Sequence, residues 1–335
     1  MDVDFIIAGQ GIAGTWLSYV LWKSGYKIMV ADHTDGKNSS LAAGALINPV
    51  NVNRAVAVKD AASIMTMARQ QYREMEQVLQ CSFYKENTLF VWNDFKIEDA
   101  ALHHPFIKML SEKEQSRLSV YITDGPAAFK VEPVGCIDAS VLLQNWKAFL
   151  RQQQAFVAAK IHAEQIREKP GGLQWNGISA KGIIFCNGAA AMRQPLFQHI
   201  PFTPNCGDAL LLDIPEGHFD RILHLRHLRL IPLGANRYWC GSNYRWDYKD
   251  VKPDAVWREQ TEAFLRKWLR VPFAVREHIV AERPTTAGQQ PVYGFLKKYP
   301  RIGIFNGLGT RGFSLAPVLA RQFVSAIQKG QIPEV

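Results

Sequence analysis

Residues 5–22 read FIIAGQGIAGTWLSYVLW, eighteen consecutive positions without a charged side chain. About 18 to 20 apolar residues can cross a bilayer, so the length of this run alone permits a membrane span. The neighbouring residues favour another interpretation, because Asp2 and Asp4 precede the run where a signal peptide carries basic residues. Three glycines also interrupt the run, at positions 9, 11 and 14. We therefore expect neither a signal peptide nor a membrane anchor here.

The three glycines have the spacing G-x-G-x-x-G, and secondary-structure signals surround them in a specific order. A strand-like apolar run at residues 5–8 precedes them, and a helix-like stretch at 12–24 follows. A second strand at 27–31 then ends at Asp32, about twenty residues beyond the glycines. This order of strand, turn, helix, strand and acid is typical of a dinucleotide-binding fold. A buried helix with incidental glycines is the alternative.

Each glycine has its own role in such a site. The first permits a tight turn, the second lets the backbone approach a pyrophosphate, and the third lets the helix pack closely on the strand. The pyrophosphate then lies at the positive helix N-terminus, and the acid accepts hydrogen bonds from ribose hydroxyls. The cofactor contacts expected from this part of the chain are Gly9, Gly11, Ile12, Ala13, Gly14, Asp32 and His33.

Composition restricts the class of protein. The chain has 335 residues, 47% of them hydrophobic, which is enough for a large core and two domains. Its five cysteines are scattered without C-x-x-C spacing, which suits a reducing cytoplasm and indicates neither zinc nor a disulfide framework. The pair His103 and His104 lacks further ligands at useful spacing. We therefore expect a cytoplasmic protein without a metal site.

The net charge of +9 is concentrated in one part of the chain. Residues 221–311 contain 17 Lys and Arg against 7 Asp and Glu, a difference of +10, so the whole excess lies there. Such a stretch is usually a set of solvated faces. An acidic ligand, either a carboxylate substrate or a nucleic acid, is the alternative.

The order of periodic segments predicts two domains. Helical spacing extends over residues 59–79, Asp138 is a good N-cap for a further helix, and the apolar run at 181–191 resembles a buried parallel strand. Residues 39–50, SSLAAGALINPV, read as a loop. Strand patterns and turns alternate over 206–245. We predict an α/β fold, with an α+β second domain, in which a mostly antiparallel substrate domain (59–135 and 205–282) is inserted into a Rossmann-like cofactor domain (1–58, 136–204 and 283–335).

The C-terminal stretch NGLGTRGFSLAP favours FAD over NAD as the dinucleotide. It carries glycines at 307, 309 and 312 before a helix that begins near Phe313. A nicotinamide enzyme has no need for a second glycine loop here, whereas a flavin has an isoalloxazine ring that must be held. A nicotinamide-dependent dehydrogenase is therefore the less favoured interpretation.

Five segments, spread over nearly the whole chain, occur in the same order as in one known enzyme family. They are G-Q-G-I-A-G with Asp32, SSLAAGAL, IIFCNGA, ERPTTAGQQPVYG and NGLGTRGFSLAP. Together they resemble the D-amino-acid oxidase superfamily of FAD-dependent amine oxidases, which includes glycine and sarcosine oxidases. The resemblance implies FAD as cofactor and hydride transfer from a carbon bearing an amine to flavin N5, giving an imine that water hydrolyses.

Matching positions imply roles for individual residues. Arg283 corresponds to the arginine that pairs with the substrate carboxylate, with an ion pair to Glu282 as the alternative, and Arg311 to a basic residue of the C-terminal flavin loop. Gly188 corresponds to the turn after the returning strand. The amides of Gly312 and Phe313 would face the flavin pyrimidine edge. The other implied cofactor contacts are Ser40, Ala43, Gly44, Gly307, Gly309 and Thr310.

Two departures from the family pattern concern the substrate. The Asp-Gly that usually follows R-P-x-T is Ala287-Gly288 here, followed by two glutamines. Glycine oxidases place a substrate-contacting Tyr before x-x-Pro, whereas this chain has Arg229 in RLIP. We therefore include Arg229 with Arg283 and Arg311 as expected catalytic-site residues. These departures favour a larger or more acidic substrate than a small apolar amino acid.

A second resemblance raises another substrate class. G-T-R-G-F-S-L-A-P and the G-A-L of residues 44–46 are similar to the oxidase domain of the bifunctional enzyme that trims carboxymethylaminomethyl-uridine in tRNA. We favour a small-molecule amine or carboxylate over tRNA, because the basic residues are diffuse along the sequence and the chain has no recognisable RNA-binding appendage. An FAD-linked 2-hydroxy-acid dehydrogenase and a non-catalytic flavoprotein share the cofactor motifs and stay open.

Overall fold

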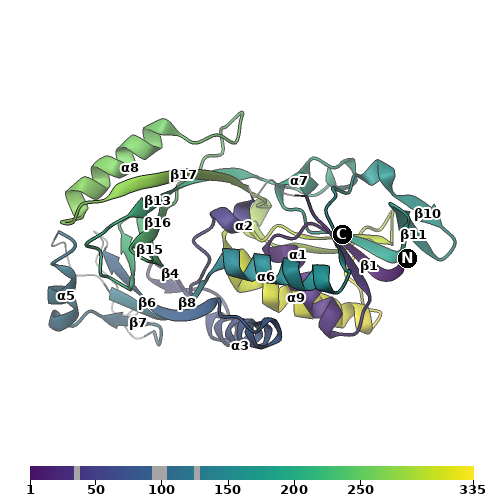
Figure 1. The fold of residues 1–335 in the computed structure, drawn as a ribbon, viewed down its shortest axis with the longest axis horizontal. Helices are drawn as coiled ribbons and strands as arrows, with labels where there is room; N and C mark the ends of the chain where they lie inside the picture. The colour runs from purple at the N-terminus through teal and green to yellow at the C-terminus, as the bar shows by residue number, and fades with distance from the viewer. Residues whose placement is uncertain (34–37, 93–103, 124–128) are drawn as a thin grey trace.

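The computed structural model describes residues 1–33, 38–92, 104–123 and 129–335. Within them the chain forms an eight-stranded sheet, a nine-stranded sheet and a small two-stranded sheet of β4 (Val50–Asn51) and β5 (Val56–Ala57). Figure 1 shows the two large sheets at opposite ends of the molecule, with both termini at the end that carries the eight-stranded sheet. The predicted α/β fold with a second, mostly antiparallel sheet is confirmed.

The eight-stranded sheet is built around the segment that contains the first glycine loop. β1 (Asp2–Ala8) lies between β2 (Ile28–Ala31) and β12 (Ile178–Phe185) and is parallel to both. Parallel strands covered on both faces are apolar throughout, as all four residues of β2 are buried. The sheet is completed by parallel β9 (Phe156–Val157) and β19 (Ile302–Asn306), and by antiparallel β10 (Arg167–Lys169), β11 (Gly172–Trp175) and β18 (Val292–Phe295).

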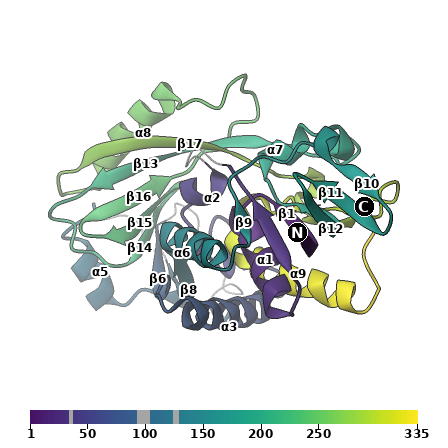
Figure 2. The same cartoon turned by 45° about the vertical axis from the view of Figure 1, so that its right-hand side comes forward.

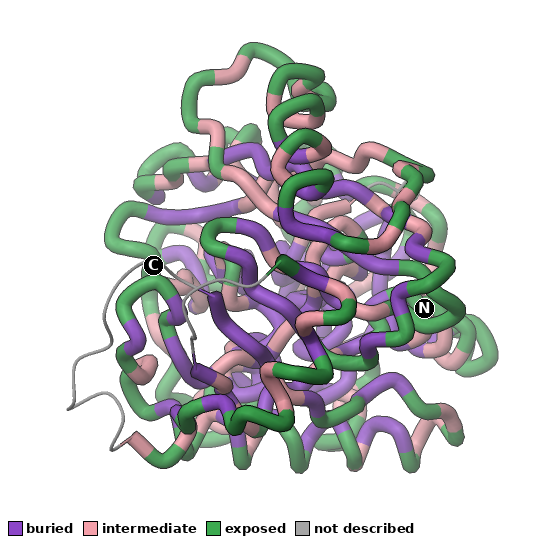
Figure 3. The backbone as a smooth tube through the Cα atoms, turned by 90° about the vertical axis from the view of Figure 1, so that its left-hand side faces the viewer, coloured by how far each residue is buried: buried purple, intermediate pink, exposed green. Residues whose placement is uncertain are grey.

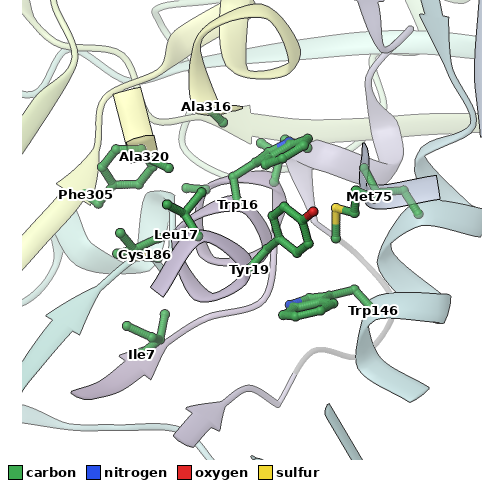
Figure 4. Close-up of a cluster of buried hydrophobic side chains, with 14 of the residues drawn as sticks. Ile7, Trp16, Leu17, Tyr19, Met75, Trp146, Cys186, Phe305, Ala316 and Ala320 are labelled. Carbon is green, nitrogen blue, oxygen red and sulfur yellow. The ribbon is translucent and has the colours of Figure 1, made fainter. Parts of the chain in front are cut away.

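Helices α1 (Ile12–Lys23), α3 (Ala61–Leu79), α6 (Ala139–Gln152) and α9 (Gly312–Gln328) pack together beside this sheet. Aromatic side chains form the centre of the packing, with Trp16, Tyr19 and Trp146 in edge-to-face contacts (Figure 4). The α6 helix begins where the sequence predicts, because the Asp138 side chain accepts a hydrogen bond from the Val141 amide at 2.9 Å. The uncharged run 5–22 is therefore a buried strand and helix.

In the nine-stranded sheet every pair is antiparallel except β14 with β6. Helix α8 (Ala255–Trp268) lies over β17 and β13 on the side opposite α2 (Ser39–Ala42) (Figures 1 and 2). The strands are β17 (Ala274–Arg283), β13 (Asn205–Asp213), β16 (Arg237–Gly241), β15 (Leu228–Gly234), β14 (Ile222–Leu225), β6 (Tyr84–Trp92), β8 (Phe129–Ile137), β3 (Leu46–Ile47) and β7 (Ile107–Met109).

Short elements complete the fold, including α5 (Glu112–Leu118) and α7 (Ala189–Met192). The segment 39–50, which the sequence predicts as a loop, instead contains α2, β3 and the start of β4. The Asn38 side chain caps α2 by accepting from the Leu41 amide at 2.9 Å, a local signal that the sequence analysis missed. β3 joins the nine-stranded sheet, and β8 and β17 extend across or up to predicted domain boundaries, so the division into two domains stays a prediction.

Buried segments form the interior of the nine-stranded end of the molecule, with exposed turns around them (Figure 3). No helix within the described residues is both long enough and apolar enough to span a membrane.

Candidate active site

A cavity of about 2070 Å³ is lined by both large sheets. The eight-stranded sheet contributes the carboxyl ends of four parallel strands, through Ala8, Ala31, Cys186 and Asn306. Open α/β sheets bind their ligands at this edge. The nine-stranded sheet contributes the face that carries Ala209, and α2 lies beside the same cavity.

The first glycine loop has little room for side chains. Gly9 has φ +101°, and a Cβ there would lie 2.7 Å from Asn187 Cα. A Cβ on Gly14 would lie 1.8 Å from the Gly9 carbonyl oxygen, so Gly14 permits close packing of α1 and does not itself line the cavity. Gly11 is the N-cap of α1 and offers no capping side chain. This helix end therefore presents its positive dipole to the cavity, where a pyrophosphate fits.

Ser40 and Asp32 line the same cavity as this helix end. The Ile12 amide donates a hydrogen bond to Ser40 Oγ at 2.9 Å, which joins α1 to α2. Asp32 follows β2, lines the cavity with His33 and is 8% exposed. Lys147 Nζ on α6 lies 3.8 Å from Asp32 Oδ2, a contact that the sequence analysis missed. The carboxylate is thus held at the position expected for an acceptor of ribose hydroxyl groups.

The second glycine loop joins β19 to α9. Asn306 Nδ2 donates to the Gly188 carbonyl at 2.9 Å, which ties this loop to the turn after β12. Gly307 has φ +73° and is buried against Thr286 and does not line the cavity. Arg311 Nη2 donates to the Gln289 carbonyl at 3.3 Å. Helix α9 begins here without a side-chain cap, so a second positive helix end meets the same cavity.

The predicted residues are therefore brought together from distant parts of the chain. Apart from Gly14 and Gly307, all of them line the cavity: Gly9, Gly11, Ile12, Ala13, Asp32, His33, Ser40, Ala43, Gly44, Gly188, Arg229, Arg283, Gly309, Thr310, Arg311, Gly312 and Phe313. Their contacts with cofactor and substrate stay predictions.

Arg283, the last residue of β17, has its guanidinium over the cavity face of β13. A Cβ on Gly207 would lie 1.8 Å from Arg283 Nη2, so the absent side chain makes the space that the guanidinium fills. Nη1 donates to Asn205 Oδ1 at 2.7 Å and to the Asn243 carbonyl at 3.2 Å. Nη2 donates to Ser242 Oγ at 3.0 Å. These contacts fix the orientation of the fork.

The oxygen atoms that accept hydrogen bonds from Arg283 all belong to uncharged groups. The acid whose charge affects this guanidinium, Asp208, forms no salt bridge with Arg283. Among the described residues no carboxylate forms a salt bridge with it, and burial lowers the pKa of its guanidinium. Glu282 does not pair with it; Glu282 instead pairs with Arg193 at 2.6 Å and accepts from Tyr248 Oη at 2.6 Å. The Tyr244 ring lies 4.7 Å from the guanidinium carbon and supplies a cation–π contact. The guanidinium thus keeps a positive charge in the cavity that no described acid pairs with.

Arg229 on β15 is a second cavity arginine of this kind. Its Nε is buried without a hydrogen-bond partner, and burial lowers the pKa of its guanidinium. No carboxylate within the described ranges forms a salt bridge with it. Several other cations of the basic stretch 221–311 are neutralised: Arg258 and Arg266 with Glu262, Arg276 with Asp213, Arg245 with Asp208, and Lys252 with Asp250.

Residues that position the two sheets against each other escaped the sequence analysis. Trp239 Nε1 donates to the Ala42 carbonyl at 2.9 Å and so joins β16 to α2. A Cβ on Gly44 would lie 2.5 Å from Ile231 Cδ1, which explains a glycine where this loop crosses the sheet. The sequence analysis also missed Gly207 and Asn205, which contact the Arg283 guanidinium. Only the strand register brings these two residues to Arg283, and the sequence carries no local signal for that register.

The chain matches the family described as DAO, FAD dependent oxidoreductase, over residues 4–326. It therefore belongs to this family, and it is an FAD-dependent enzyme. Similar solved structures include glycine oxidase from Geobacillus kaustophilus, with 16% identity, TM-score 0.79 and coverage of 98% of this chain and 95% of that one.

Two further solved structures are similar. Iminodiacetate oxidase from Chelativorans sp. BNC1 has 17% identity, TM-score 0.74 and coverage of 99% and 96% of the two chains. L-proline dehydrogenase from P. horikoshii has 14% identity, TM-score 0.79 and coverage of 98% and 94%. At these identities the likeness concerns the fold.

Proposed function

We propose that this enzyme oxidises the C–N bond of an amine that carries a carboxylate, producing an imine that water hydrolyses. The observation that carries the proposal is Arg283, a partly buried and oriented guanidinium in the FAD cavity without an acidic partner among the described residues. Bound FAD supplies the two-electron acceptor. The names of the similar oxidases and the dehydrogenase, which refer to amino acids and iminodiacetate, support the same substrate class.

The free hydrogen-bond donors of Arg283 suit a carboxylate. An arginine has five N–H donors, and Asn205, Asn243 and Ser242 accept from three of them. The Nε–H and one Nη2–H have no acceptor among the described residues, and the Nε and Nη2 atoms form one edge of the fork that suits two carboxylate oxygens. This bidentate geometry orients the substrate as well as binding it, which makes the carbon next to the amine reach the same position at each turnover.

Hydride transfer from an amine that binds in its neutral form requires no proton-transfer residue of the protein. The rest of the cavity has another role. The N-termini of α1 and α9 both meet the cavity and stabilise negative charge there. We favour a free small molecule over tRNA, because acids pair with several basic side chains of residues 221–311: Asp250 with Lys252, Glu262 with Arg258 and Arg266, and Asp213 with Arg276.

Anaerobic reduction of the bound FAD tests this function, followed by the loss of its absorbance. The substrates are matched pairs with and without a carboxylate: glycine and methylamine, alanine and ethylamine, sarcosine and dimethylamine. We expect reduction by carboxylate amines only, and a loss of about 30-fold to several thousand-fold in the reduction efficiency of Arg283→Leu. Equal reduction by both members of every pair, or full efficiency in Arg283→Leu, would contradict the proposal.

A further inference from the structure

A second cation of the cavity has no part in the function proposed so far. Arg229 lines the cavity, its Nε has no hydrogen-bond partner, and no acid in the described part of the chain pairs with it. Two other arginines of the stretch 221–311 have such partners: Arg245 pairs with Asp208 at 3.0 Å, and Arg276 pairs with Asp213. Arg229 is partly buried, and a partly buried arginine whose charge no described acid compensates is suited to bind an anion.

The strand register puts Arg229 and Arg283 on one face of the sheet. Arg229 is opposite Gly241, Gly241 is opposite Ala209, and opposed residues of antiparallel strands point to the same face. Gly207, two residues from Ala209, lies on this face too, and the guanidinium of Arg283 covers it. Strand spacing and rise put the Cα atoms of Arg229 and Gly207 about 12 Å apart. Because the Arg283 guanidinium already lies over Gly207, this span is the distance that a small molecule and the Arg229 side chain have to cover together.

The surface between the two arginines is small and apolar. Its residues are Gly207, Ala209, Gly241 and Trp239, whose indole carbon Cη2 would lie 2.9 Å from a Cβ on Gly241. None of them can neutralise either guanidinium. Burial lowers the pKa of both arginines and Tyr244 raises it, which indicates that both surround the same region of the cavity. A ligand with an acid at each end and a short carbon chain between them matches this surface.

We propose that Arg229 is a specificity-determining residue that binds a second anionic group of the substrate, so that the enzyme acts on amines bearing two carboxylates. This inference rests on the proposed function, in which Arg283 binds the first carboxylate. A monocarboxylate would leave the Arg229 charge uncompensated, and a dicarboxylate compensates both.

Binding of unreactive acids tests the second site independently of turnover. The FAD-loaded enzyme is titrated with butyrate and with glutarate, which differ by one carboxylate, and binding is followed by the change in flavin absorbance. We expect glutarate to bind about 30-fold more tightly. Arg229→Gln should remove this preference, Arg229→Lys should keep part of it, and Arg221→Gln, a surface control on the same stretch, should keep all of it.

Reactive amines then separate the two proposals. Sarcosine and iminodiacetate are secondary amines that differ by one carboxylate, and the ratio of their efficiencies of anaerobic FAD reduction should fall by about 30-fold in Arg229→Gln. Equal butyrate and glutarate binding in the parent enzyme, or an unchanged preference in Arg229→Gln, overturns the role of Arg229 even if both amines are oxidised. A preference for glutarate that Arg229→Gln abolishes supports that role even if neither amine is oxidised, in which case only the proposed function fails.

Discussion

A methyl group on Gly207 should disable the arginine site without removing its charge. The Cβ of Gly207→Ala would lie 1.8 Å from Arg283 Nη2 and 2.2 Å from Cζ. Protein Cβ atoms essentially never approach other atoms within 3.0 Å, so the guanidinium must move by at least 3.0 − 1.8 = 1.2 Å. That movement lengthens the hydrogen bonds to Asn205 and Ser242, which are now 2.7 and 3.0 Å.

The expected cost follows from this displacement. A misplacement of about 1 Å in a substrate-positioning group costs about 100-fold in rate, equivalent to about 2.7 kcal/mol in transition-state stabilisation. We expect kcat/KM for a carboxylate amine to fall by about that factor in Gly207→Ala. FAD should stay bound, since Gly207 lies on the nine-stranded sheet and the glycine loops at the helix N-termini are unchanged.

The assay is steady-state turnover of carboxylate amines, with flavin absorbance as the measure of cofactor content. The double variant Gly207→Ala/Arg283→Leu is the matched control, because it should be no worse than Arg283→Leu alone if Gly207 acts only through Arg283. Unchanged kcat/KM in folded, FAD-loaded Gly207→Ala would refute the reasoning. A double variant that loses the product of both single effects would refute it too.

Four other results are expected. Gly11→Val should release FAD, because its side chain would occupy the pyrophosphate position at the N-terminus of α1, and stoichiometric FAD in the purified variant would contradict this. Gly14→Ala should lower Tm in a thermal melt, since its Cβ would lie 1.8 Å from the Gly9 carbonyl; an unchanged Tm would oppose that packing role. Burial, with a smaller effect of the Arg229 charge, lowers the pKa of His224 from 6.5 to about 3, so the unfolded chain takes up a proton that the folded chain does not, and stability should fall as pH decreases from about 6.5 towards 3. At pH 4.5, denaturant titration should show that the free energy of unfolding of His224→Gln has fallen by about 3 kcal/mol less than that of the parent enzyme. The variant of the exposed His218, His218→Gln, is the control and should behave like the parent. An unchanged pH dependence in His224→Gln would contradict this. Binding of a free amino acid should change little between 50 and 200 mM salt, whereas six phosphate contacts with tRNA would give a log–log slope of about −5.

Local sequence signals were sufficient for the fold around the first glycine loop. The close contact of Gly14 with the Gly9 carbonyl lies within one strand–turn–helix unit, and Asp138 caps its own helix. These two interactions connect residues close in sequence, so the chain itself carries their pattern, whereas the tight space at Gly9 is set by the distant Asn187. The short helix α2 was missed because its cap, Asn38, lies in a stretch of small residues that also suits a loop.

The surroundings of Arg283 and Arg229, by contrast, depend on long-range pairing. Arg283 could be selected by family resemblance, but its partners Asn205 and Ser242 are 78 and 41 residues away in sequence. Arg229 reaches the same face through two successive strand pairings. A shift of register by one residue would turn either side chain to the opposite face, and no periodic pattern in the sequence specifies that register uniquely.

Single-turnover reduction by matched amines and hydroxy acids tests the central claim most directly. The carboxylate of glycine or alanine is the same as that of glycolate or lactate, so the proposed role of Arg283 applies equally to both members of each pair and only the oxidised bond differs. Mixed anaerobically with the FAD-loaded enzyme, an amine bearing one or two carboxylates should bleach the flavin and release one equivalent each of a carbonyl product and of ammonia or a primary amine, while the matched hydroxy acid leaves it oxidised. Bleaching by the hydroxy acids and not by the amines would contradict C–N oxidation and identify a hydroxy-acid dehydrogenase instead.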